Sequence, residues 1–283
     1  MRIDLHSHTI NSDGLMTVPE LVALAKARRL QLLALTDHDT MIGVAHFLKL
    51  CKERRIQALP GIEMSTKYED LELHILALNP HKNLGSLIKH LEVQIKKRKE
   101  RARKVVTKLK KVGFTLPTAM ETELFGLRNI GKPHLARAYL SISGNKKLLQ
   151  TEFLRKATIS NFIQYILDKP GQVGYVAKSR IAVKDAIKLI HETGAKAVLA
   201  HPQFDLPSNR TRKQCCDDLK EMGLDGIEAV NGRRHLEQRA EFAELAKHYG
   251  WFMTAGSDTH NKTRLGVNVS KRMYEALMRI FFS

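Results

Sequence analysis

The stretches RIDLHSHT (residues 2–9) and LLALTDHD (residues 32–39) decide the fold of this chain. Each begins with a short apolar run, which is typical of a buried strand, and ends in histidine and aspartate. Between them, Pro19 begins a helical pattern that runs to Leu30. The first forty residues therefore predict a strand–helix–strand unit with polar side chains where the strands end.

The same arrangement recurs along the chain, in GIEMS (61–65), LELHIL (71–76), LAHP (199–202) and SDTH (257–260). About seven such units predict an α/β fold with a parallel sheet or barrel, in which the carboxyl ends of the strands meet at one face. We expect nine metal-ligand side chains to converge there: His6, His8, Asp13, His38, Glu63, His74, His201, Asp258 and His260.

Six histidines and three carboxylates are too many for one ion, since zinc takes about four ligands and a hard ion about six. They predict two or three divalent ions, with Glu63 as the expected bridge. His6 and His8 lie two positions apart, so both side chains face the same side of a strand. Asp37 and Asp39 flank His38, and one of them is a candidate to orient a ligating imidazole; alternatively, Asp37 only caps the strand end.

Manganese is the expected metal, with iron, zinc or magnesium as alternatives. Such a centre indicates hydrolysis by a metal-bound hydroxide, which would serve as the nucleophile. Among protein side chains, Asp39 is a possible catalytic residue, and the sequence identifies no general acid.

Residues 84–175 interrupt the strand–helix alternation. Apolar residues keep helical spacing from Leu87 to Val112, while KKRKERARKVVTKLKK (96–111) carries ten basic residues and one acid, Glu100. We expect a helical insertion that caps the mouth of a metal-binding barrel formed by residues 1–83 and 176–283. The basic helix contains no aromatic residue for base stacking, so it either steers RNA electrostatically or is a solvated face.

A possible phosphate site lies in GKPHLARAYL (131–140), where Pro133 begins a helix and Lys132, His134 and Arg137 lie in its first turns. Helix amino termini with nearby cations bind phosphate groups. The alternative is an ordinary helix start with a solvated basic edge.

The composition points to a polyanionic partner. The 283 residues carry a formal net charge of +18, and such a field attracts nucleic acid unless it only reflects a generally basic proteome. Three cysteines and the lack of a leader-like start favour a cytoplasmic location. No apolar run approaches a membrane span, and no feature predicts an obligate protein partner.

The set HSHT…D, TDHD, GIEMS, H, AHP and SDTH resembles the polymerase and histidinol phosphatase (PHP) superfamily over essentially the whole chain. The resemblance implies a distorted (β/α)7 barrel with up to three metal ions. The insertion around His134 is similar to that of standalone nucleotide phosphatases, although Lys132 stands where they more usually have arginine.

For function, this resemblance implies a metal-dependent phosphoesterase that holds a 5′-phosphate through His134, Arg137 and Lys132 and cuts at the adjacent 3′-oxygen. Acting on short 5′-phosphorylated RNA, it would be a 5′→3′ exoribonuclease that releases nucleoside 5′-monophosphates. Acting on a 3′,5′-nucleotide bisphosphate, it would remove the 3′-phosphate, as in pAp to AMP. The alternatives are a small-molecule phosphatase, such as one for histidinol phosphate, and a nucleic-acid-binding protein with a degenerate site.

Overall fold

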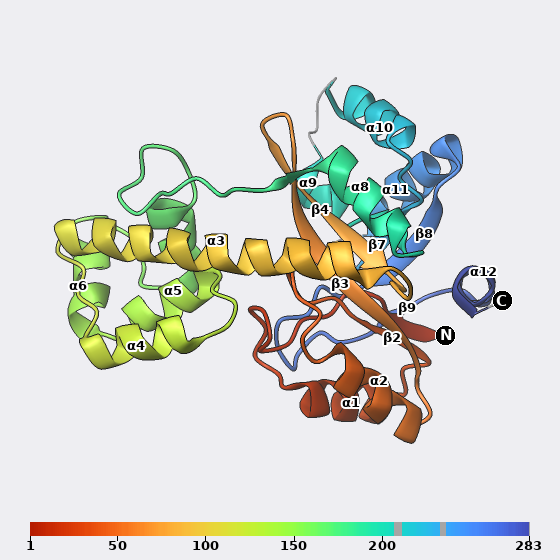
Figure 1. Cartoon of the computed structure of the whole chain (residues 1–283), viewed down its shortest axis with the longest axis horizontal. Coiled ribbons are helices and arrows are strands. Elements are labelled where there is room, and N and C mark those ends of the chain that lie inside the picture. Colours follow the sequence, from red (N-terminus) through yellow and green to blue (C-terminus); the bar gives the residue numbers. More distant parts are fainter. Residues whose placement is uncertain (207–210, 233–235, 283) are drawn as a thin grey trace. The chain divides into compact units, whose positions relative to one another are not determined.

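The computed structural model describes residues 1–206, 211–232 and 236–282, which form two compact units (Figure 1). The first unit comprises Met1–His90 and Arg180–Ser283, and the second comprises Leu91–Ser179. Helix α3 (Leu84–Lys111) begins in the first unit and ends in the second. The second unit contains most of the segment that we expect to be inserted, at 84–175.

The described residues of the first unit form a nine-stranded sheet in the order β8-β7-β6-β4-β3-β2-β1-β9, with β5 paired to β3. The sheet closes between β8 and the segment after β1, because Leu5 N–H donates to the carbonyl of Ala255 at 2.9 Å and Ser7 bridges Thr259. The sheet is therefore a nearly closed barrel, as expected. The strands are β1 (Arg2–Asp4), β2 (Leu32–Leu35), β3 (Gln57–Tyr68), β4 (Leu71–Leu78), β5 (Ile181–Ala182), β6 (Lys196–Leu199), β7 (Gly226–Asn231), β8 (Phe252–Gly256) and β9 (Val267–Asn268).

Helices between the strands cover this sheet. Helix α1 begins at Val18, where Thr17 and Glu20 form a capping box. Its apolar face packs with that of α2 against β2, α8 contacts β3, β4 and β6, and α11 contacts β7 and β8 (Figure 1). The helices are α1 (Val18–Ala27), α2 (Val44–Glu53), α8 (Val183–Glu192), α9 (Pro202–Asp205), α10 (Thr211–Glu221), α11 (Leu236–Tyr249) and α12 (Lys271–Phe282).

One expectation about the strands is wrong, because β4 runs antiparallel to both β3 and β6. Only two residues separate Tyr68 from Leu71, and a parallel neighbour needs a crossover of about a dozen residues. Glu63 and His74 consequently lie within β3 and β4 rather than at carboxyl ends.

The second unit is helical and has its own apolar core, which includes Leu109, Phe114, Tyr139 and Phe162. After α3, its elements are α4 (Thr118–Gly126), α5 (Lys132–Leu140), α6 (Ser143–Thr151), α7 (Ile159–Phe162) and a π-helical turn at Ile163–Leu167. No helix among the described residues of the chain is long and apolar enough to cross a membrane.

Candidate metal centre

The turn after β1 places His6 and His8 at the barrel mouth. Between them, Ser7 donates from its hydroxyl to the carbonyl of Ala34, which fixes the segment to β2 at 2.7 Å. Downstream, Gly14 packs so closely on the backbone of His8 that a Cβ atom would lie 2.7 Å from its carbonyl carbon and oxygen. Only glycine leaves this turn undistorted, and the turn brings Asp13 back toward the histidines.

Glu63 lies at the centre of the site and is 1% exposed. One carboxylate oxygen, Oε2, lies 3.2 Å from Nε2 of His6, 3.2 Å from Nε2 of His8 and 3.0 Å from Nδ1 of His38. The other, Oε1, lies 2.8 Å from Nε2 of His201 and 3.7 Å from Nδ1 of His74. Two oxygens facing two sets of imidazoles is the geometry that a bridging carboxylate requires.

The remaining ligand candidates lie on either side of His8. Asp13 has an oxygen 3.2 Å from Nε2 of His260, and Asp258 has one 3.2 Å from Nε2 of His8. All nine side chains expected from the sequence thus belong to one cluster, in which His38, His74 and His260 are partly exposed and the others are buried. Four overlapping groups in it bring their ligand atoms within 4.8 Å of one another: His8, Asp13, His38 and His260; His6, His8 and Glu63; His38, Glu63 and His74; and His74, His201 and Asp205.

The donor atoms fit metal binding better than hydrogen bonding. Nε2 of His6 and Nε2 of His8 are buried, lie about one hydrogen-bond length from Glu63, and yet make no hydrogen bond. Buried polar groups are nearly always satisfied, so such convergence indicates a shared ion. Imidazole and carboxylate ligands in overlapping groups are consistent with a multinuclear metal site.

The site is strongly polarised. Burial disfavours the charged form of His6, but the carboxylates of Glu63, Glu228 and Asp258 outweigh it and raise the pKa of His6 to about 9. Burial alone would raise the pKa of the Glu63 carboxyl, and the imidazoles of His38 and His6 instead hold that pKa well below its usual range. For His38, burial prevails and lowers its pKa to about 4.

Glu228 on β7 is a functional candidate that our reading of the sequence missed. It is 1% exposed, and its Oε2 lies 3.4 Å from Nδ1 of His6, on the side of the ring opposite Glu63. The same oxygen accepts from the backbone N–H of His201 at 2.7 Å and from the side chain of Asn231 at 3.1 Å. A single acid in the apolar strand GIEAV was the available signal.

Asp205, at the end of α9, was also missed. Its Oδ2 lies 3.2 Å from Nδ1 of His74 and 3.3 Å from Nδ1 of His201, and it accepts the backbone N–H of His74. For His201, Asp205 lies at the ring nitrogen opposite the one that faces Glu63, a position from which a carboxylate orients a ligating imidazole. For His74, Asp205 lies at the same Nδ1 that faces Glu63 and is itself a candidate ligand. Asp205 lies four residues after His201, a spacing that brings two side chains together only on a helix, and the sequence did not predict the short helix α9.

Asp37 lies behind the turn that carries His8. Its carboxylate accepts from the backbone and hydroxyl of Thr9 and from the Ser12 hydroxyl, which lies 3.4 Å from Nδ1 of His8. Asp37 therefore buttresses the turn that carries His8. Asp39 accepts from the backbone N–H of Ser65 at 3.0 Å and has a left-handed φ of 48°.

The expected phosphate-binding residues all lie on α5 in the helical unit. His134 accepts the backbone N–H of Gly131 at Nδ1, which caps the helix at 3.0 Å. His134 and Arg137 line a pocket of about 290 Å³ together with Glu123 and Ser141. Lys132 does not line this pocket, and it forms an ion pair with Asp168.

Comparisons with known proteins agree with this architecture. The 5′-3′ exoribonuclease Rnm of Escherichia coli K12 is 30% identical over 259 residues, which cover 91% of this chain and 84% of the relative. The 3′,5′-nucleoside bisphosphate phosphatase of Chromobacterium violaceum is 32% identical over 91% of this chain and 87% of the relative. A solved structure of an amidohydrolase from C. violaceum, with bound sulfate and no metal, matches 97% of this chain and 96% of that chain with a TM-score of 0.80 and 27% identity.

The PHP domain profile matches residues 4–234, a range that runs from the last residue of β1 through β7 and includes seven of the nine expected ligands. The barrel, the buried histidine–carboxylate cluster and these relatives lead to one conclusion. The chain belongs to the PHP domain family and is a metal-dependent phosphoesterase.

Proposed function

We propose that this protein is a manganese-dependent 5′→3′ exoribonuclease that also removes the 3′-phosphate of 3′,5′-nucleotide bisphosphates. The observation that carries the proposal is the position of Glu63, buried among five histidines whose ring nitrogens lie 2.8–3.7 Å from its two oxygens. Relatives at about 30% identity over most of the chain are named for these two activities, which supports this substrate class.

In this proposal, the nine side chains predicted from the sequence would hold two or three divalent ions, and Glu63 would be the shared ligand. When bound, the ions supply positive charge that activates water and neutralises charge on the phosphate oxygens. The protein itself fixes the imidazoles from behind. Glu228 holds His6 and Asp205 holds His201, in each case at the ring nitrogen opposite the one that faces Glu63. The Ser12 hydroxyl donates to Asp37 and lies beside Nδ1 of His8.

Asp39 is the protein side chain that the sequence offers for moving a proton. It is 3% exposed and lies one residue after His38, but one of its oxygens already accepts the N–H of Ser65. We propose a proton-transfer role for Asp39 at this site. Asp39→Asn should then lower kcat more than it changes KM.

The 5′-phosphate is assigned to the helical unit, which in this proposal caps the active-site face. His134 and Arg137 share one pocket, and an arginine guanidinium is suited to bidentate phosphate contacts. Lys132 remains part of the proposal as a point charge near the same helix start, although Asp168 competes for it.

A direct test compares manganese-loaded protein on a 3′,5′-nucleotide bisphosphate and on the same nucleoside 3′-monophosphate. We expect the bisphosphate to give a 5′-nucleotide and inorganic phosphate with the higher kcat/KM. Arg137→Ala should remove most of this preference, whereas Arg128→Ala, an exposed arginine of the same unit, should retain it. Equal rates on both compounds, or better hydrolysis of histidinol phosphate, would reject the assignment.

A further inference from the structure

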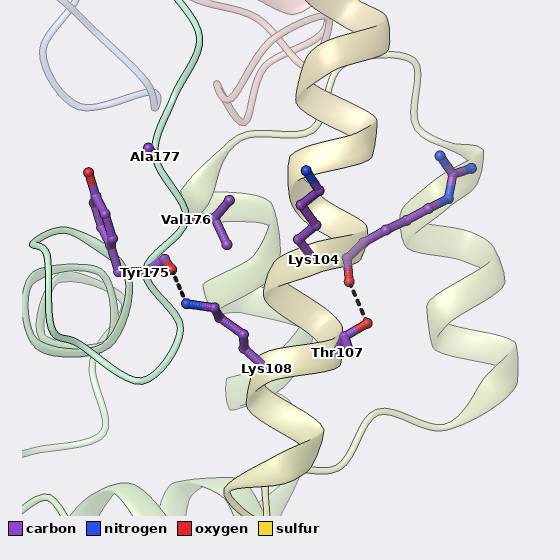
Figure 2. A pocket seen from close by; sticks show the side chains of 7 residues that line it. Lys104, Thr107, Lys108, Tyr175, Val176 and Ala177 are labelled. Carbon is purple, nitrogen blue, oxygen red and sulfur yellow. Dashed lines mark hydrogen bonds between the residues drawn. The ribbon is translucent and has the colours of Figure 1, made fainter.

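An open pocket of about 580 Å³ lies in the helical unit between α3 and the segment around Tyr175 (Figure 2). It is lined by Arg103, Lys104, Thr107 and Lys108 on the helix and by Tyr175 and Val176 on the segment. We call it the α3–Tyr175 pocket. None of its lining residues belongs to the metal centre or to the pocket at His134.

The basic residues of the pocket are held at the surface by the packing of α3. Ala102, Val105 and Leu109 are buried in the core of the helical unit, so Lys104 and Lys108 on the other face are exposed. Elsewhere on the helix, Lys110 is neutralised by Glu121 at 2.6 Å. Among the described residues, no ion pair joins a carboxylate to Arg103, Lys104 or Lys108. The Arg103 guanidinium lies over the ring of Phe125 at 5.2 Å and Lys108 donates to a backbone carbonyl, and neither contact neutralises the positive charge.

The fold also supplies an aromatic ring that the sequence of the helix lacks. Lys108 reaches 67 positions along the chain to donate to the backbone carbonyl of Tyr175 at 2.8 Å, and Figure 2 shows Val176 beside this contact. Gly174 packs so tightly that a Cβ atom would lie 2.7 Å from Leu167, which fixes the segment on the core. Tyr175 is thus a half-buried residue on a fixed segment, and its ring lines the same pocket as Lys104 and Lys108.

We propose that the α3–Tyr175 pocket binds single-stranded RNA, with phosphates on Arg103, Lys104 and Lys108 and a base against Tyr175 and Val176. Sites for single-stranded nucleic acid combine a basic surface with aromatic platforms in this way. An acidic peptide would use the cations but not the ring. The inference rests on the proposed function and names a second contact for RNA, which a nucleotide bisphosphate is too short to need.

The test uses Tyr175→Ala and the double variant Lys104→Gln with Lys108→Gln in the full-length, manganese-loaded protein. A matched control is Lys96→Gln with Lys111→Gln, two exposed lysines of the same helix with the same loss of charge. Binding of a phosphorothioate-linked, 5′-phosphorylated hexaribonucleotide is measured by fluorescence anisotropy at several salt concentrations. Hydrolysis of a 3′,5′-nucleotide bisphosphate is measured in parallel.

We expect Tyr175→Ala to weaken RNA binding about tenfold and Tyr175→Phe to restore it, because stacking needs the ring and not the hydroxyl. The double lysine variant should also reduce the slope of log K against log salt by about 1.4, and the control should change binding less. Bisphosphate hydrolysis should stay at the level of the unchanged protein.

RNA binding that is unaffected by these changes, or weakened equally by the control, would overturn the proposal. Equal binding of a polyglutamate peptide, insensitive to Tyr175→Ala, would also overturn it by showing a site for any polyanion. Failure of the proposed function would look different, since the unchanged protein would then hydrolyse neither bisphosphate nor RNA while the anisotropy comparison could still be made.

Discussion

Replacing Glu228 with glutamine should weaken metal binding without removing a proposed metal ligand. The carboxylate lies 3.4 Å from Nδ1 of His6, while Nε2 of the same ring faces Glu63 and Asp258 at 3.2 and 3.7 Å. A negative partner behind the ring fixes its orientation and increases its basicity toward a metal. Glutamine has the same shape but removes the charge and half of the acceptor capacity.

The magnitude follows from these contacts. A buried hydrogen bond to a charged group is worth about 1.5–3 kcal/mol, and losing such an outer partner typically costs about 10- to 100-fold in metal affinity. Each tenfold change in affinity corresponds to about 1.4 kcal/mol, so the hydrogen-bond free energy and the expected loss of metal affinity agree. The remaining amide oxygen can still accept from the backbone of His201 and the side chain of Asn231, so the fold should persist.

The assay is calorimetric titration of chelator-stripped protein with manganese, accompanied by thermal unfolding. Glu192→Gln, an exposed glutamate on α8, is the matched control and should bind as the unchanged protein does. Manganese affinity and stoichiometry in Glu228→Gln equal to those of the control would refute the orienting role. A collapse of folding in the metal-free variant would instead show that Glu228 is mainly structural.

Three further perturbations test other parts of the structure. Gly256→Ala would place a Cβ atom 2.3 Å from Cβ of His6, so the amount of bound metal and the thermal stability should both fall. Gly85→Ala is the control and should be tolerated, because nothing lies within 4 Å of its added Cβ atom. Equal stability of the two variants would contradict this packing. Asp205→Asn should weaken metal binding about tenfold, so elemental analysis should find fewer ions per chain. The control Asp185→Asn changes an exposed aspartate and should bind metal normally. Full metal occupancy in Asp205→Asn would show that Asp205 has no role in the site. Burial raises the pKa of the Cys51 thiol from 9.0 to about 12, so at pH 8 its thiolate fraction is about 1000-fold lower than that of an exposed cysteine. All three cysteines are buried, so iodoacetamide should label none of them in the native protein and all three in denaturant. Rapid labelling of the native protein would refute their burial.

The barrel was predictable because its strands are short apolar runs that end in polar residues, as in LLALTDHD. The direction of β4 was not predicted, since hydrophobic periodicity does not encode direction. The two-residue gap between Tyr68 and Leu71 was a usable signal that we did not apply. The error in the direction of β4 has only a local consequence, because an antiparallel β4 still brings His74 to Glu63.

The nine expected ligand positions lie in one cluster, and which of them coordinate metal stays a prediction. Residues behind them were harder to foresee. Asp205 and Tyr175 act through contacts that only the folded chain creates, at separations of 131 residues to His74 and 67 to Lys108. Patterns of residue type predict where chemistry gathers, while the supporting contacts depend on packing between elements far apart in the sequence.

The central claim is end-directed cleavage of RNA by a metal-dependent phosphoesterase. The most direct measurement incubates manganese-loaded protein with a short 5′-phosphorylated RNA labelled at its 3′ end and separates all products over time. The account predicts nucleoside 5′-monophosphates from the first turnover and labelled chains that shorten one nucleotide at a time. Internal fragments without mononucleotides would contradict it.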